Sequence, residues 1–429
     1  MRISLLTIAL LFSLHISLSD DDTLEWINEN SIEIEDSNQN SELKEFDKAV
    51  PERFSNAKIF GFGEATHNSK EFFDLKAKFF RYLVENQDVK TFIMEDAFQA
   101  EKGINEWISG GEGEKETIAN NFHIGFWYTK EVVNLLLWMR LYNKGRPKGE
   151  QLRFYGMDIQ SGKGLNKEIR DFVKKNNLDI DEELLAIADD SSNQVFNSNQ
   201  ARGWAEKHMP KLRQIEKSIN EFRDLNPNQR DEANVALRSI NYLIQFTNYV
   251  EHTETEIRDS SMFENVKWII ENQTKNGKAF IWAHNEHINK AEMYYLGSRI
   301  KNLGRHLKDF YKEDYFSVGF DFGGGNLRGY INDKKEGGKW KNYYVPEPIK
   351  KTYAQTLWKA DKEIFFLDMK EALLTDPTNF FSTKNRNILV AAGGYQPKPL
   401  HKVMVNKVYT DFYDGLIFVK NVSLPEPIN

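Results

Sequence analysis

Two short segments, far apart in the sequence, carry the groups best suited to acid–base chemistry. They are GEATH at residues 63–67 and WAHNEH at residues 282–287. An imidazole gives and takes protons near neutral pH, and a neighbouring carboxylate can orient the ring or hold a hydroxyl group. We therefore expect the two segments to form one catalytic site in which a histidine activates water.

The first segment lies between a predicted strand at residues 57–63 and a predicted helix at residues 68–85. Asn68 is the predicted N-cap, and Glu71 completes a capping box. His67 thus precedes a helix N-terminus, whose positive end disfavours the imidazolium form. A neutral imidazole can accept a proton, so His67 is the candidate base and Glu64 its partner.

The second segment places His284, Glu286 and His287 directly after an apolar run. A single histidine there would be most simply explained as a buried, hydrogen-bonded residue at a helix start. Two histidines at one strand end, together with His67 at another, favour a functional cluster.

The sequence lacks the residues that several other kinds of catalytic or binding site require. The chain has no cysteine, which removes thiol nucleophiles, disulfides and a lipoprotein anchor. It has no G-x-S-x-G elbow, and the glycines at 323–325, predicted to form a turn, are not followed by the Lys-Ser/Thr of a P-loop. Water activated by histidine remains. His67, His284, His287 and a carboxylate would also suit a zinc or manganese ion, although no H-E-x-x-H motif is present.

Four short apolar runs, each ending near an ionisable residue, predict buried strands at residues 57–63, 90–95, 152–158 and 278–283. The ionisable residues at their ends are Glu64, Glu95, Asp158 and His284. Intervening helices indicate an α/β fold with a mostly parallel central sheet flanked by helices. Ligands of such sheets bind at the carboxyl ends of the strands, so these residues are expected to converge. Further strands are predicted at 315–322, 363–368, 387–392 and 415–419.

The chain divides into three predicted parts: a signal peptide at 1–19, a polar surface helix and linker at 20–56, and an α/β domain at 57–429. Within the domain, the charged residues from about 165 to 258 predict a helical insertion that covers the cleft, or else further scaffold helices. A basic residue before an apolar run, with small residues preceding Asp20, is typical of an exported protein, periplasmic or extracellular. No other segment reaches the length of a membrane span.

The overall composition is that of an ordinary globular protein, with 40% hydrophobic and 28% charged residues. The formal net charge of −7 argues against nucleic acid or an anionic membrane surface as a partner. We expect a small molecule as the partner.

The quoted motifs resemble those of the erythromycin esterase family, which includes succinoglycan-biosynthesis-related hydrolases. Beside GEATH and WAHNEH, the similar segments are Glu71-Phe72-Phe73, Glu95, Phe126-Trp127, Gly156-Met157-Asp158 and residues 413–418. The resemblance extends from about residue 58 to residue 419 and keeps the same order along the chain.

The resemblance implies a metal-independent hydrolase of carboxylic esters. The best-known members of the family hydrolyse the macrolactone of erythromycin-type antibiotics and so confer resistance. By position, His67 matches the essential base, Glu64 and Glu95 match supporting carboxylates, and His284 and His287 match a second histidine pair. The fold also resembles that of a haem-binding family, which leaves a ligand-binding protein as an alternative.

The resemblance also implies three substrate-binding candidates, Lys76, Trp127 and Asp158. Family members commonly carry arginine where this chain has Lys76, and lysine lacks the planar fork that binds a carboxylate through two hydrogen bonds. A signal peptide is a second departure, because resistance members are typically cytosolic. The lysine puts the binding of a carboxylate or lactone oxygen at this position in doubt, and an exported member of the family can have another substrate.

Overall fold

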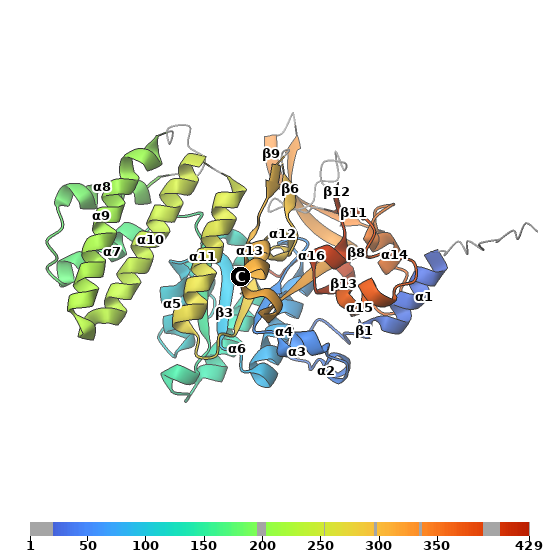
Figure 1. The fold of residues 1–429 in the computed structure, drawn as a ribbon. Helices are drawn as coiled ribbons and strands as arrows, with labels where there is room; N and C mark the ends of the chain where they lie inside the picture. The colour runs from blue at the N-terminus through green and yellow to red at the C-terminus, as the bar shows by residue number, and fades with distance from the viewer. Residues whose placement is uncertain are drawn as a thin grey trace, which may run out of the picture.

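The computed structural model describes residues 20–194, 203–252, 254–295, 298–333, 337–388 and 404–428. Within this part of the chain, a nine-stranded sheet has the order β1-β10-β13-β8-β2-β5-β3-β4, with β9 paired to β8 (Figure 1). Its strands are β1 (Ile32–Glu33), β2 (Ile59–Phe62), β3 (Thr91–Ala97), β4 (Arg153–Asp158), β5 (Ala279–Trp282), β8 (Tyr315–Asp333), β9 (Gly337–Val345), β10 (Ile364–Asp368) and β13 (Gly415–Val422). In the order of the sheet, the neighbouring strands β13, β8, β2, β5, β3 and β4 all run parallel. Strands β10, β1 and β9 are added to them in antiparallel pairings.

Helices flank both faces of this sheet, which confirms the predicted fold class. They are α1 (Asp20–Asn30), α2 (Lys44–Lys48), α3 (Glu52–Asn56), α4 (Lys70–Gln87), α5 (Ala100–Ile108), α6 (Lys130–Asn143), α7 (Leu165–Lys175), α8 (Glu182–Ser192), α9 (Trp204–Leu225), α10 (Arg230–His252), α11 (Thr255–Gln273), α12 (Asn285–Ile288), α13 (Leu303–Tyr311), α14 (Tyr353–Leu357), α15 (Met369–Thr375) and α16 (Tyr409–Phe412). None of the helices in the described ranges is both long and apolar enough to cross a bilayer.

The two faces of the sheet bury separate apolar clusters. Phe60 and Phe62 of β2 pack with α4 and α6 on one face, whereas Ile59 packs with α11 and α13 on the other. Successive side chains of a strand point to opposite faces, so a strand covered on both sides must be apolar throughout. This explains why the parallel strands are continuous apolar runs in the sequence.

The predicted helical insertion forms a bundle of its own next to α11 (Figure 1). Helices α7 to α10 share a third apolar cluster, which includes Leu212 and Ile240. The bundle is tied to the sheet by the Tyr242 hydroxyl, which donates to the Gly156 carbonyl over 2.6 Å. Arg258, the last residue of the insertion, lies near the start of α11 and donates hydrogen bonds to Glu95 and Asp158.

Residues 20–56 belong to the fold, which corrects their assignment as a linker. Strand β1 pairs with β10, and Ile27, Phe46 and Phe54 are fully buried in the two main clusters. The apolar residues are too widely spaced among polar ones to show a helical or strand period. Their burial depends on partners from later segments, among them Phe79 of α4, Phe316 of β8 and Phe366 of β10.

The glycines at 323–325 lie inside β8 and do not form the predicted turn. A Cβ atom at Gly323 would come within 2.6 Å of the Lys420 carbonyl, and one at Gly325 within 2.0 Å of the Val422 carbonyl. Gly325 also has φ +123°, a region that L side chains rarely adopt. The glycines are therefore needed where β8 passes close to β13 and continues into its hairpin with β9.

Two smaller differences concern element boundaries. The N-cap of α4 is Ser69, whose hydroxyl accepts from the Phe72 amide, and not Asn68. The predicted strand at 387–392 begins as β11 (Asn385–Ile388), which pairs with β12 (Met404–Lys407) outside the main sheet; residues 389–392 fall outside the described ranges. A further small sheet pairs β6 (Met293–Tyr295) with β7 (Ser298–Ile300).

Candidate active site

The strands β2, β5, β3 and β4 are consecutive neighbours in the sheet, so the residues at their carboxyl ends share one edge. The ring centroids of His67, after β2, and His284, after β5, lie 5.1 Å apart. The two motifs thus meet as expected in one largely buried cluster.

Glu64 connects His67 to Lys76. One Glu64 carboxylate oxygen contacts His67 Nδ1 and the other contacts Lys76 Nζ, with Glu64 and Lys76 fully buried. Lys76 Nζ also lies 3.9 Å from the Trp282 ring centroid. Burial lowers the pKa of Lys76 to about 8, although Glu64 opposes this shift. Because the carboxylate holds Nδ1, Nε2 is the His67 nitrogen that can accept a proton from water.

Aromatic rings wall His67 on two sides. Phe126 stacks on the imidazole with centroids 5.0 Å apart, and Trp127 meets it edge-on at 5.5 Å. Trp127 is fully buried, and its indole N–H donates to the Glu95 carbonyl over 3.3 Å. These contacts restrict the orientation of the His67 ring beyond what Glu64 alone would do.

His284 is held as a neutral hydrogen-bond donor. Its backbone N–H donates to a Glu95 carboxylate oxygen over 2.8 Å, and its Nδ1 accepts from the Glu286 amide over 3.2 Å. Burial, reinforced by His67, lowers the pKa of His284 to about 4. An imidazole that accepts at Nδ1 carries its proton on Nε2, so that atom can donate to a substrate oxygen.

The pKa of His287 is shifted in the opposite direction to that of His284. Its Nδ1 lies 3.0 Å from Asp259, and its Nε2 lies 2.9 Å from Arg258 Nη1 and 3.3 Å from Glu95. Burial alone would lower the pKa of His287, but Asp259 and Glu95 outweigh it and raise the pKa to about 10. Arg258 pairs with Glu95 and Asp158, whereas Asp259 pairs with His287 itself, so the carboxylates outnumber the guanidinium and the net effect on the pKa of His287 is upward.

Arg258 joins the site groups that come from β3, β4 and α12. Its guanidinium donates to Glu95 over 2.7 Å and to Asp158 over 2.9 and 2.8 Å. Burial would raise the pKa of Glu95, but His287 and Arg258 hold it well below the usual range. The sequence prediction missed Arg258 and Asp259 as site residues. They lie at the end of a charged, helix-patterned stretch, and nothing local distinguishes them from residues on a solvated helix face.

Glu286, the remaining ionisable residue of its motif, faces away from this network. Its carboxylate forms an ion pair with Lys407 Nζ, and Lys407 belongs to β12 in the C-terminal part of the chain. Lys407 also lies 3.5 Å from the Tyr413 hydroxyl. Glu286 therefore contributes to the cluster mainly through the backbone amide that it offers to His284.

The three predicted substrate-binding residues are buried and contact other residues of the site. Lys76 and Trp127 are 0% exposed and Asp158 is 1% exposed, and each already has a partner within the protein. Direct contact with a substrate would require these partners to separate. We therefore propose that these three residues support the site and do not contact the substrate.

Metal coordination was the alternative left open by the residue types. Within the described ranges, no group of three or more His, Asp or Glu side chains is arranged to hold a metal ion. Both ring nitrogens of His287 and both oxygens of Glu95 are engaged by protein groups. Those two side chains would have to exchange partners before they could serve as ligands.

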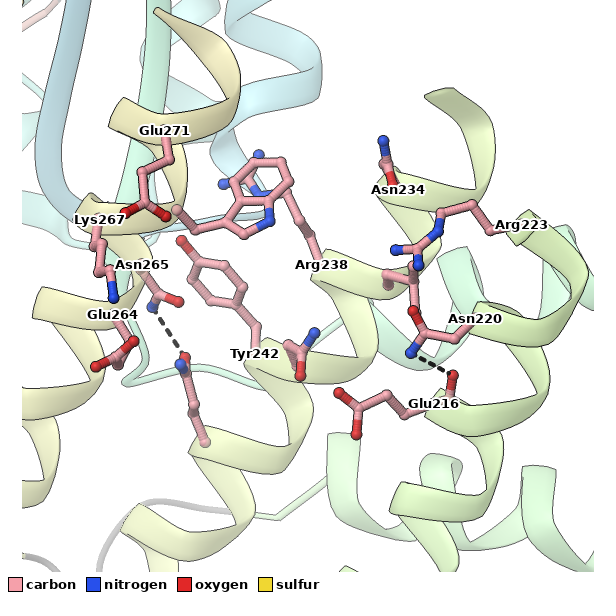
Figure 2. Close-up of a pocket in the computed structure, with 14 residues that line it drawn as sticks. Glu216, Asn220, Arg223, Asn234, Arg238, Tyr242, Glu264, Asn265, Lys267 and Glu271 are labelled. Atoms are coloured by element: carbon pink, nitrogen blue, oxygen red, sulfur yellow. Dashed lines mark hydrogen bonds between the residues drawn. The ribbon is translucent and has the colours of Figure 1, made fainter. Parts of the chain in front are cut away.

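A cavity of about 360 Å³ lies away from this cluster, between α9, α10 and α11 of the insertion (Figure 2). Charged and amide side chains line it, among them Glu216, Arg238 and Asn265. Arg238 is committed to Glu101 and Asn265 to Gln245. None of the histidines of the two motifs borders this cavity.

The structure is that of an α/β protein with a mostly parallel central sheet and a buried His–Glu pair at the carboxyl edge of that sheet. The family model described as Erythromycin esterase matches residues 84–422, and the chain therefore belongs to the erythromycin esterase family. Membership of this family supports a hydrolase.

Relatives extend the match over most of the chain. Erythromycin esterase type II of Escherichia coli is 25% identical over 393 residues, covering 82% of this chain and 91% of the relative. The putative hydrolase YbfO of Bacillus subtilis (strain 168) is 21% identical over 427 residues, covering 93% and 90%.

Solved structures show the same fold. A Bacillus cereus protein superposes with a TM-score of 0.81 at 22% identity, covering 95% of this chain and 99% of its own. A succinoglycan biosynthesis protein gives 0.77 at 20% identity, covering 95% and 98%. A mutant of the erythromycin esterase EreC in its open conformation gives 0.66 at 16%, covering 93% and 99%.

Proposed function

We propose that this protein hydrolyses a carboxylic ester with water activated by His67. The observation that carries the proposal is the pairing of His67 Nδ1 with Glu64, opposite a neutral His284 whose ring centroid is 5.1 Å away. One imidazole is thereby oriented as a base and the other as a donor, which are the two functions that ester hydrolysis needs.

In the proposed reaction, His67 Nε2 removes a proton from water while the water oxygen attacks the ester carbonyl carbon. The carbonyl oxygen becomes an oxyanion and receives a hydrogen bond from His284 Nε2–H. The tetrahedral intermediate then collapses, the carbon–alkoxide bond breaks, and the protonated His67 returns its proton to the leaving alkoxide. The products are a carboxylic acid and an alcohol.

The remaining residues position these two groups. Glu64 fixes the tautomer of His67, and Lys76 neutralises Glu64 from below. Glu95 holds the backbone of His284, while Arg258 and His287 neutralise Glu95. His287 and Glu95, which the sequence predicted to be catalytic, are in this proposal positioning residues.

The proposal is tested by screening the purified protein against macrolides and a panel of simple esters, with His67→Ala as the control. We expect ester hydrolysis by the wild type that is lost in His67→Ala and unaffected by a chelator. Activity that a chelator removes and added metal restores would instead establish a metal-dependent hydrolase. A macrolactone is included because the family name comes from that reaction.

We also propose that the mature chain is exported and begins near Asp20. The packing of α1 supports this position, since Thr23 and Trp26 already hydrogen-bond to Thr378 and Thr375. The preceding residues 1–19 fall outside the described ranges. N-terminal sequencing of periplasmic or secreted material should begin at or near Asp20, and recovery of only uncleaved cytosolic protein would contradict the proposal.

A further inference from the structure

A row of aromatic rings leads from His67 to an exposed hairpin. Phe126 stacks on His67 at 5.0 Å, Trp340 of β9 meets Phe126 edge-on at 5.7 Å, and Tyr330 of β8 meets Trp340 at 5.7 Å. The first ring is part of the candidate active site, and the last two belong to the β8–β9 hairpin. This hairpin projects beyond the edge of the main sheet (Figure 1).

The outer rings of this row are open to solvent. Trp340 is 37% exposed and Tyr330 is 38% exposed, unlike the fully buried aromatic residues of the core. The hairpin register pairs Tyr330 with Trp340 directly and, two positions further along the ladder on the same face, Arg328 with Asn342. Arg328 lies 5.5 Å from the Trp340 ring centroid. One face of the hairpin thus offers two flat rings bordered by a cation and an amide.

We propose that Trp340 and Tyr330 bind a ring-bearing group of the substrate, held at a distance from the ester bond. This inference rests on the proposed function, because it takes His67 as the point of attack. Trp340 lies two ring-to-ring steps from His67, so a compact ester at the catalytic site cannot reach it. Exposed aromatic faces with polar groups beside them favour flat apolar ring faces, which aryl groups and sugar rings both present.

A cross-strand aromatic pair also stabilises a hairpin, so stability alone cannot test this surface. Tyr344 provides a matched control. It is an aromatic residue of the same strand and the same face, 63% exposed and paired with Asn326 outside the row of rings. A purely structural contribution would make replacements at both positions behave alike.

The experiment compares methyl esters of matched acyl length that end in a linear alkyl group, a naphthyl ring or a glucosyl ring. We expect the wild type to prefer at least one ring-bearing ester, and Trp340→Ala to lower that preference in kcat/KM about three- to tenfold. Tyr344→Ala should leave the preference unchanged. The naphthyl and glucosyl esters identify which kind of ring the surface accepts.

Equal effects of Trp340→Ala and Tyr344→Ala, or no ring preference in the wild type, would overturn the inference while leaving hydrolysis intact. If His67→Ala hydrolyses these esters as fast as the wild type, the proposed function fails instead. Calorimetric binding of the corresponding free acids tests the surface without turnover. In that experiment, Trp340→Ala should weaken the binding of the ring-bearing acid by the same factor. Unchanged binding would again overturn the inference.

Discussion

His284 is the N-cap of the short helix α12 and His287 lies within that helix, yet the protein shifts their pKa values in opposite directions. Burial lowers the pKa of His284 to about 4, whereas Asp259 and Glu95 overcome burial and raise that of His287 to about 10. The His284 ring faces His67, and the His287 ring faces the Arg258 network. This difference separates the proposed donor from the residues that position it.

The opposite shifts predict how these two histidines affect stability. A depressed pKa in the folded state stabilises above the ordinary value of 6.5, and this contribution is lost as the pH falls through about 4. A raised pKa stabilises below 6.5, and this contribution is lost as the pH rises through about 10. Together they favour a stability maximum near pH 6.5. Denaturant titrations across pH should show His287→Asn reducing the alkaline decline; an unchanged alkaline limb would contradict the assignment.

His67→Ala should reduce turnover of a confirmed ester by about 10²–10⁴-fold, because the general base is removed. His67 lies in a strand-to-helix turn and packs against Phe126 and Trp127, so its truncation removes two ring contacts, but the flanking strand and helix keep their own packing and the fold should persist. His252→Ala, at an exposed position at the end of α10, is the matched control and should retain full activity. The measurement is kcat/KM on variants with equal thermal unfolding. Near wild-type turnover by His67→Ala would refute the mechanism.

Arg258→Ala should destabilise the protein by about 3–5 kcal/mol, since it leaves Glu95 and Asp158 buried beside an incomplete set of positive charges. Arg170→Ala is the control: Arg170 also bridges two carboxylates, but Glu182 there is 77% exposed. Its loss should cost about 1 kcal/mol or less. Guanidinium unfolding measures both, and equal losses would show that Arg258 is no more than a surface ion pair.

Lys76→Met should lower kcat by up to about 10²-fold, because Glu64 loses its buried counterion and no longer holds His67 in place. Lys78→Met is the control on the same helix. Lys78 is also buried, but its partner Asp36 is half exposed, so solvent can replace the lost contact. Lys76→Arg should retain more activity than Lys76→Met. Equal kcat values for Lys76→Met and Lys78→Met would rule out the positioning role.

Local patterns in the sequence were sufficient for the parallel part of the sheet and for the meeting of the two motifs, but not for the edge strands β1 and β9. The strands that carry Glu64, Glu95, Asp158 and His284 are continuous apolar runs, because the sheet is covered on both faces. Parallel strands align their carboxyl ends, so residues at those ends converge whatever their order along the chain.

The roles of these residues depend on contacts that only the folded chain creates. Arg258 and Asp259 resemble surface charges in the sequence, yet they decide the charge of His287. Lys76, Trp127 and Asp158 are of types suited to substrate binding, but packing places them beneath the site. Burial and partner charges shift a pKa in opposite directions, and both are set by neighbours from distant segments. Residue type and spacing therefore locate this site, and tertiary packing assigns the charge and orientation of each group in it.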